Sequence, residues 1–192
     1  NGLNPLKITG KFPIANLDNL NAPGIVEKIN QVYPVFPALP NSGVAITGGD
    51  IAQTSDLARE GFNVDGTGVK VCVISDSYNT ILGNPAATGI INGDLPGSTN
   101  PYGFTTPVQM IGVGDYPYGT RLDEGRAMLE IIHDIAPGAD LGFRTGVISE
   151  GDFAMGVIQM AQAGCDAIAD DISFITSPFY KDGVIARAVD SV

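Results

Sequence analysis

The sequence predicts an α/β fold: a doubly wound parallel sheet in three layers, with helices covering both faces. Two observations support this prediction. Segments such as VKVCVISD (69–76) read as continuous apolar runs, which are typical of strands buried on both faces of a sheet. Stretches of helical length separate these runs, and strands that alternate with helices along a chain indicate parallel strands joined by helical crossovers.

From residue 48 onward the predicted elements follow one another without a visible repeat. A helix is expected over 49–62, and the GTG turn (66–68) leads into the strand 69–76. Since these glycines precede their strand, they cannot be the phosphate turn of a dinucleotide-binding fold. The remaining predictions are a long Gly-, Pro- and Asn-rich loop (79–106), a strand (107–115), a helix from near Leu122, a strand (139–145), a helix (151–163), a strand (166–175) and a helix from Asp182.

Residues 1–45 differ from the rest in being rich in Asn and Pro. They contain one short helical pattern at 22–32 and a stretch broken by prolines at 33–43. We therefore expect a separate leading segment over 1–45 and one domain over 46–192.

Composition limits the classes of function. The chain has 192 residues, 44% of them hydrophobic, which is enough apolar mass for one sizeable core. A net charge of −11, with only ten scattered Lys and Arg, argues against a nucleic-acid partner and favours solubility, including at low pH. No apolar run approaches the ~20 residues that span a bilayer, and the first residues do not resemble a signal peptide. We expect no membrane partner.

The two cysteines, Cys72 and Cys165, are too few for a disulfide scaffold. Both lie in apolar, strand-like segments, where small buried thiols are common. The sequence therefore favours two buried thiols over a disulfide.

Two carboxylates are expected to meet at one edge of the sheet. Ligands of open parallel sheets bind beyond the carboxyl ends of the strands, and Asp76 closes the strand 69–76. The strand 107–115 leads through a loop to a helix whose first turn holds Glu124, so Asp76 and Glu124 should face each other. Plainer readings stay open, because Asp123 and Glu124 also suit a helix start, by ~0.3–1 kcal/mol, and Asp is common in turns.

Three blocks of sequence resemble the subtilisin-like serine peptidases (subtilases). DGTGVKVCVISDSYN (65–79) is similar to the segment that carries their catalytic Asp, and DEGRAMLEIIHDIAPGADLGF (123–143) is similar to their catalytic helix and the strand entry after it. GCDAIADDISF (164–174) resembles the strand that lines their substrate cleft. The resemblance covers roughly 48–192 and implies a subtilisin-like sheet that is incomplete in this chain.

The sequence departs from the subtilase pattern at the catalytic His, where it has Glu124. A Glu at this position resembles the sedolisins, the acid-acting relatives of subtilases, although their accompanying Asp would fall at Met128. The resemblance implies a serine endopeptidase in which Asp76 and Glu124 serve a Ser nucleophile. Because two neighbouring carboxyls cannot easily both ionise, we expect them to share a proton and to work in the acid range.

The only histidine, His133, lies nine residues beyond Glu124, or about 13 Å along a helix. It is therefore expected to be stabilised by the dipole at the helix C-terminus and not to act as the base.

The nucleophile is not expected in this chain. In the family it follows a Gly-Thr-Ser block, and neither that block nor the oxyanion Ala-Gly-Asn occurs here. We expect the serine in the remainder of the catalytic domain, so that the fragment alone would be inactive. Ser75 and Ser77 are poor candidates, because hydroxyls beside a strand end usually satisfy local backbone groups.

The resemblance also implies residues that bind a polypeptide substrate. Ser173, Phe174 and Ile175 correspond to the cleft-edge segment that pairs with an extended peptide, and Ser149 and Gly151 correspond to the segment that faces it. Their plainer readings are a strand end and a helix cap.

The resemblance also has implications for Ca²⁺ binding, for the leading segment and for the location of the protein. Family members often bind Ca²⁺, but no residue here is assigned to it, since the side chains of the adjacent Asp170 and Asp171 diverge on a strand and no third ligand is predicted. No other cofactor is expected. Residues 1–45 resemble the tail of a pro-segment, and the family implies a secreted or extracytoplasmic protein.

Two alternatives to a peptidase stay open. One is a catalytically degenerate subtilase fold that serves as a peptide-binding or scaffold module. The other is a small flavodoxin-like or receiver-like module in which Asp76 binds a metal or accepts phosphate. The IAPGAD block (135–140) and the long loop after Asp76 argue against the second.

Overall fold

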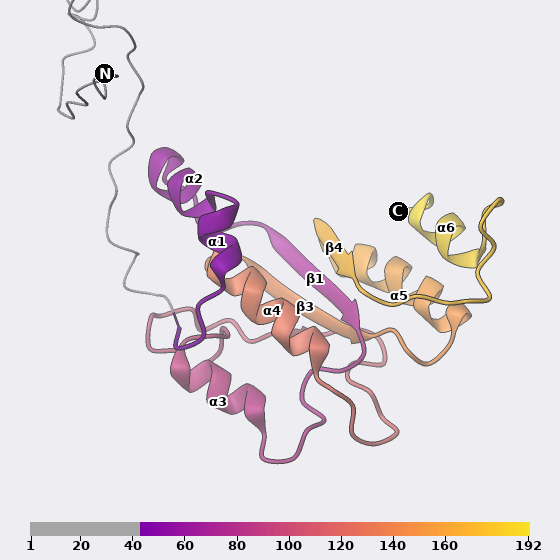
Figure 1. The fold of residues 1–192 in the computed structure, drawn as a ribbon, viewed down its shortest axis with the longest axis horizontal. Helices are drawn as coiled ribbons and strands as arrows, with labels where there is room; N and C mark the ends of the chain where they lie inside the picture. The colour runs from indigo at the N-terminus through magenta and orange to yellow at the C-terminus, as the bar shows by residue number, and fades with distance from the viewer. Residues whose placement is uncertain (1–42) are drawn as a thin grey trace, which may run out of the picture. The chain divides into compact units, whose positions relative to one another are not determined.

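The structure is a computed structural model, and it describes residues 43–192. The predicted helical pattern at 22–32 and nearly all of the leading segment lie outside the described residues. In the described part, four parallel strands form one sheet with the order β2-β3-β1-β4. Figure 1 shows β1 between β3 and β4. The predicted parallel α/β architecture is therefore confirmed.

The helices and strands follow the predicted order, with strands that are shorter than predicted. Among the helices of residues 43–192, none has the length and hydrophobicity of a membrane-spanning segment. In chain order the elements are α1 (Gly48–Ala52), α2 (Ser55–Phe62), β1 (Lys70–Ser75), α3 (Pro85–Asn92), β2 (Gln109–Met110), α4 (Glu124–Ile135), β3 (Asp140–Thr145), α5 (Glu150–Gln162), β4 (Ala167–Asp170) and α6 (Val184–Val189).

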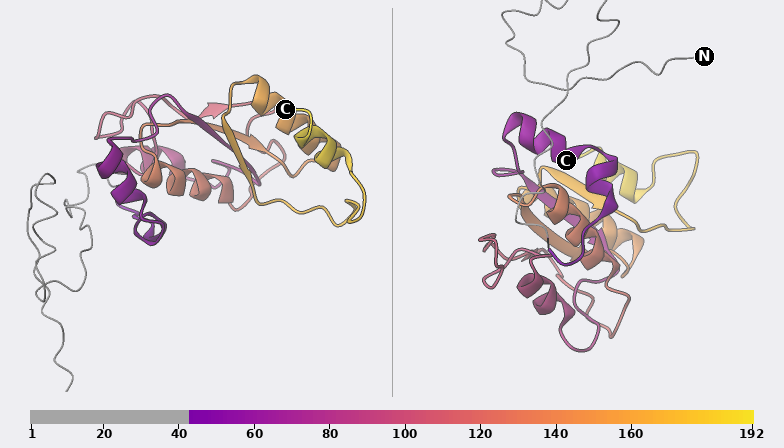
Figure 2. Two further views of the ribbon diagram at one scale, coloured as in Figure 1. Left: turned by 90° about the horizontal axis from the view of Figure 1, so that it is seen from above. Right: turned by 60° about the vertical axis from the view of Figure 1, so that its left-hand side comes forward.

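The central strand β1 separates two hydrophobic cores. Its side chains alternate between the faces of the sheet, and Cys72, Val73 and Ile74 are all fully buried. Val73 packs with Leu129 of α4 on one face, whereas Cys72 and Ile74 pack with residues of α5 on the other. The two views in Figure 2 show these helix layers around the sheet. The three-layer arrangement thus follows from the continuous apolar run of β1.

The structure differs from the predicted elements at two helices. The helix predicted over 49–62 is two helices, because Thr54 adopts a left-handed conformation (φ 59°) between α1 and α2. The loop 79–106 contains α3, which begins with Pro85 after an Asn84 cap and ends before Gly93. Pro at a helix start and Gly after its end are the usual punctuation of a helix, so the sequence did carry a signal for α3.

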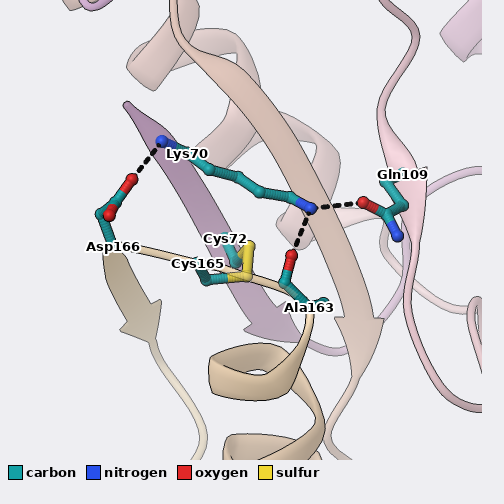
Figure 3. Close-up of a disulfide and its surroundings, with 6 residues drawn as sticks. All are labelled: Lys70, Cys72, Gln109, Ala163, Cys165 and Asp166. Carbon is teal, nitrogen blue, oxygen red and sulfur yellow. Dashed lines mark hydrogen bonds between the residues drawn. A yellow bond between two sulfur atoms is a disulfide. The ribbon is translucent and has the colours of Figure 1, made fainter. Parts of the chain in front are cut away.

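The prediction of two free thiols is wrong, because Cys72 and Cys165 form a disulfide (Figure 3). The pairing of β1 with β4 brings the two residues together, with their Cα atoms 5.8 Å apart. Hydrogen bonds tie the same corner, since Lys70 donates its amide N–H to Asp166 and its ammonium group to the carbonyl of Ala163. A disulfide suits an extracytoplasmic protein.

Candidate functional site

Asp76 and Glu124 lie at the carboxyl edge of the sheet, as predicted. Asp76 directly follows β1, and Glu124 is the first residue of α4. The Asp76 carboxylate is 7% exposed and accepts three backbone N–H groups: Ser77 at 2.5 Å and Glu124 at 2.9 Å on Oδ1, and Leu122 at 2.8 Å on Oδ2. The carboxylate of Asp76 therefore holds the beginning of α4 against the end of β1.

The side chain of Glu124 is free of such contacts. It is exposed, and it forms no hydrogen bond or ion pair with any residue of the described range 43–192. Asp76 thus contacts the backbone of Glu124, and no hydrogen bond joins the two carboxyl groups in this part of the chain. The shared proton between them stays a prediction.

Asp123 is the most buried acid of the site, at 1% exposure. Its Oδ1 accepts the hydroxyls of Ser77 and Thr80 and the Thr80 N–H, all at 2.8 Å, and its Oδ2 accepts the Ile81 N–H at 3.2 Å. Burial alone would raise the pKa of Asp123, but the hydrogen bonds from Thr80, Ser77 and Ile81 outweigh it and lower the pKa. Asp123 occupies the N-cap position of α4, as its plainer reading predicts, but its side chain makes no capping hydrogen bond to that helix.

A third carboxylate, Asp115, fixes the other side of the same loop. It accepts the N–H groups of Tyr78 at 2.9 Å, Asn79 at 2.8 Å and Tyr116 at 2.8 Å. The sequence alone predicts no role for Asp115. The loop after β1 is therefore held by carboxylates that come from elsewhere in the chain.

The hydroxyls of the two serines beside Asp76 are not accessible: one is hydrogen-bonded to Asp123 and the other is buried. Ser77 donates its hydroxyl to Asp123 and accepts the Asp123 N–H at 2.9 Å. Ser75 is completely buried, and its hydroxyl has no hydrogen-bond partner among the residues described. Neither hydroxyl is placed to attack a substrate, which agrees with the prediction that neither is the nucleophile.

The two predicted substrate-binding segments lie next to each other. Glu150, between Ser149 and Gly151, accepts the Ser177 hydroxyl at 2.5 Å, just beyond the segment 173–175. This contact brings the beginning of α5 to the chain that follows β4.

Within these segments, exposure and packing differ. Ser173 and Gly151 are exposed and Ile175 is 96% exposed, while the Phe174 ring packs edge-on against Phe153 at 5.7 Å. Ser149 caps α5 by accepting the Asp152 N–H at 3.1 Å, as its plainer reading predicts. A role of these residues in substrate binding stays a prediction.

His133 differs from its predicted role. It lies in the last turn of α4 but is only 2% exposed, and neither ring nitrogen has a hydrogen-bond partner within residues 43–192. Its ring packs edge-on against Phe104 at 5.3 Å. Burial lowers the pKa of His133 to about 4, so the ring is neutral above that pH and the expected stabilisation of a cation by the helix dipole is wrong.

No metal ligand can be assigned in the described part of the chain. Residues 43–192 contain no group of three or more His, Cys, Asp and Glu side chains that could hold an ion. Asp170, which ends β4, and its neighbour Asp171 are both exposed.

No protein-family model, curated protein or solved structure matches this chain. The likeness to subtilases therefore rests on the three sequence blocks. The parallel sheet that carries these blocks is compatible with that family but is shared by many others.

Proposed function

We propose that this chain forms part of a serine endopeptidase that hydrolyses peptide bonds through an acyl-enzyme. One observation above all supports the proposal: Asp76 and Glu124 come together at the carboxyl edge of β1, with the Glu124 N–H 2.9 Å from the Asp76 carboxylate. This edge is where parallel sheets bind their ligands. It is also where the blocks that resemble subtilases predict the catalytic residues.

The two acids suit different roles in that reaction. A serine hydroxyl attacks a carbonyl carbon when a neighbouring base takes its proton, and the base later returns the proton to the leaving amine. The exposed carboxylate of Glu124 is accessible for this proton transfer. Asp76 is buried and held by three N–H groups, which suits a residue that fixes the position of the base.

In this proposal the nucleophilic serine belongs to polypeptide outside these 192 residues. Ser75 is enclosed and Ser77 is bound to Asp123, so neither is available for attack. The remainder of the catalytic domain would then be a partner of this chain, and a Glu base with a neighbouring acid would favour activity at acid pH.

An extended polypeptide is the substrate that the site fits best. Exposed Ser173 and Ile175 follow β4, which is an edge strand of the described sheet, and Gly151 lies exposed at the beginning of α5. A peptide could add to this edge through main-chain hydrogen bonds. The disulfide between Cys72 and Cys165 supports a secreted or extracytoplasmic location.

Substitution of the proposed base tests this function. In the protein that carries the nucleophile, Glu124→Gln should lower the rate of cleavage of an unfolded polypeptide at acid pH by about 10²- to 10⁴-fold. Glu60→Gln, which changes a carboxylate of α2 far along the chain from the site, should leave the rate unchanged. Equal rates for Glu124→Gln and the unsubstituted protein would remove Glu124 from the mechanism.

A binding module without catalysis is the second candidate. It is favoured by the absence of any hydrogen-bond partner for the Glu124 side chain in the described range and by the enclosure of Ser75 and Ser77, the two serines beside Asp76. If it is correct, the protein should bind an unfolded polypeptide without cleaving it, and Glu124→Gln should not change the affinity.

A further inference from the structure

Ser77 and Asp123 exchange two hydrogen bonds. The Ser77 hydroxyl donates to Asp123 Oδ1 at 2.8 Å and accepts the Asp123 N–H at 2.9 Å. Ser77 directly follows Asp76, and Asp123 directly precedes Glu124. The pair therefore joins the two chain segments that carry the candidate catalytic residues. Each member of the pair is the immediate neighbour in sequence of one of those residues.

The loop after Ser77 encloses the same carboxylate. Thr80 donates both its N–H and its hydroxyl to Asp123 at 2.8 Å, and Ile81 adds an N–H at 3.2 Å. The guanidinium of Arg126 lies 3.7 Å from Asp123 Oδ2. With 1% exposure and several donors, this side chain has little freedom to move.

The backbone at Asp123 is in the left-handed region, with φ 53°. This conformation is uncommon for residues other than glycine and persists only where surrounding contacts enforce it. Here it turns the chain so that the carboxylate of Asp123 points back to the loop after β1 while the next residue begins α4.

A second contact seats the beginning of α4 on the sheet. A side chain at Gly125 would lie 2.3 Å from the Phe143 ring and 2.9 Å from the Ser77 carbonyl oxygen. There is thus no space between the first turn of α4 and the ends of β1 and β3. This close approach does not depend on the hydrogen bonds of Asp123.

We infer that Asp123, held by Ser77, is a positioning residue that fixes where Glu124 stands relative to Asp76. The inference rests on the proposed function, because it assigns Asp123 a role that acts through Glu124. The two bonds between Ser77 and Asp123 set the alignment in which Asp76 receives the N–H groups of Leu122 and Glu124. Without them, the Asp76 hydrogen bonds and the packing at Gly125 still hold the first turn of α4 on the sheet, but Glu124 is less closely fixed relative to Asp76.

The test compares Asp123→Asn and Ser77→Ala with Asp50→Asn in the protein that carries the nucleophile. Asp50 is a matched control, because its carboxylate is also hydrogen-bonded and ion-paired, to Ser55 and Arg59, but belongs to α1. We expect Asp123→Asn and Ser77→Ala to lower kcat about 10- to 100-fold with little change in KM, since small displacements of a reacting group have costs of this size. Ser77→Thr, which keeps the hydroxyl, should restore most of the rate, and Asp50→Asn should leave kcat unchanged.

The same substitution made in the Glu124→Gln variant distinguishes a positioning role of Asp123 from a general loss of structure. If Asp123 acts through Glu124, then adding Asp123→Asn to Glu124→Gln should lower the residual kcat no further, because residues that act as a unit are not additive. An unchanged kcat for Asp123→Asn, or an equal loss in both backgrounds, would overturn the inference.

Failure of the proposed function gives a different result. In that case the protein cleaves no polypeptide, or Glu124→Gln leaves cleavage unchanged, and hydrogen exchange of the Leu122 and Glu124 amides in this chain tests the role of Asp123. Exchange that is about tenfold faster in Asp123→Asn than in the unsubstituted chain, with no such change in Asp50→Asn, supports the positioning role. Unchanged exchange overturns it.

Discussion

The Asp76 carboxylate accepts the backbone N–H of Glu124 at 2.9 Å, so the two candidate catalytic residues are joined by a side chain of one and the main chain of the other. Asp76 also accepts the Leu122 N–H at 2.8 Å. An α-helix leaves its first N–H groups without partners inside the helix, and here a residue 48 positions earlier in the chain supplies one. The same contact stabilises the fold and orders the site.

Removal of the Asp76 carboxylate should therefore destabilise the protein. We expect Asp76→Ala to lower the free energy of unfolding by about 2 kcal/mol, because it leaves buried N–H groups without an acceptor. Asp76→Asn keeps one oxygen and should cost less. Urea unfolding measures both, and Asp171→Ala, at an exposed acid, should change stability by no more than about 0.5 kcal/mol. Equal stability of Asp76→Ala and Asp171→Ala would contradict this role.

A methyl group at Gly125 should be poorly tolerated. Gly125→Ala would place an atom 2.3 Å from the Phe143 ring, and we expect it to lower the free energy of unfolding by about 1–3 kcal/mol through overpacking. Gly61→Ala in α2 is the control, because nothing lies within 4 Å of its added atom and alanine favours a helix. The expectation is wrong if thermal unfolding ranks the two variants equally.

Loss of the Cys72–Cys165 disulfide should also be costly. The bond closes a loop of 93 residues, and removing it by the double change to Ala should cost roughly 2–4 kcal/mol of stability. Denaturant unfolding with and without a thiol reductant tests this, with the double variant as the control that the reductant should not affect. A reductant that leaves the unsubstituted protein equally stable would show that the bond adds nothing.

His133 should make the protein less stable as the pH falls. Burial lowers the pKa of His133 from its ordinary 6.5 to about 4, so the unfolded chain binds the proton first on acidification. The stability given by the neutral ring is complete above pH 6.5 and is lost progressively toward pH 4, by at most about 3 kcal/mol. His133→Leu should flatten this part of a stability–pH curve measured by urea unfolding. An unchanged slope would show that His133 is not titrating in this way.

The neighbouring carboxyl Asp134 should act in the opposite direction. Burial, with the charges of Asp94 and Asp50 adding to it, raises the pKa of Asp134, so the folded state keeps its proton to a higher pH than the unfolded chain does. Protonation of Asp134 therefore adds stability as the pH falls. Asp134→Asn should make the loss of stability on acidification steeper, whereas His133→Leu should make it shallower, and the same measurement distinguishes them.

The strand that ends in Asp76 and the helix that begins at Glu124 were both predictable from the sequence. A continuous apolar run identifies β1, and the shift to a helical pattern after residue 122 identifies α4 to within two residues. The parallel order of strands then places both residues at one edge. Local patterns suffice here because each element is specified by the residues within it.

Local patterns were not sufficient for contacts between distant segments. The neutral state of His133 depends on the packing of Phe104 and other residues around its ring, and the break at Thr54 depends on a single backbone conformation. The residues on either side of Thr54 are also compatible with one uninterrupted helix. The residues around His133 are also compatible with a charged histidine at a helix end. Sequence reasoning therefore misjudged both.

The sequence by itself determined the order of strands and helices along the chain, the central strand 70–75 and the edge at which the acids gather. Only the tertiary structure decided that Cys165 meets Cys72 across 93 residues, and that Asp123 turns away from its own helix to bind Ser77, 46 residues earlier. The physical reason is that hydrophobic periodicity is a property of neighbours in the chain. A disulfide or a buried hydrogen bond depends instead on which segments the folded sheet places side by side.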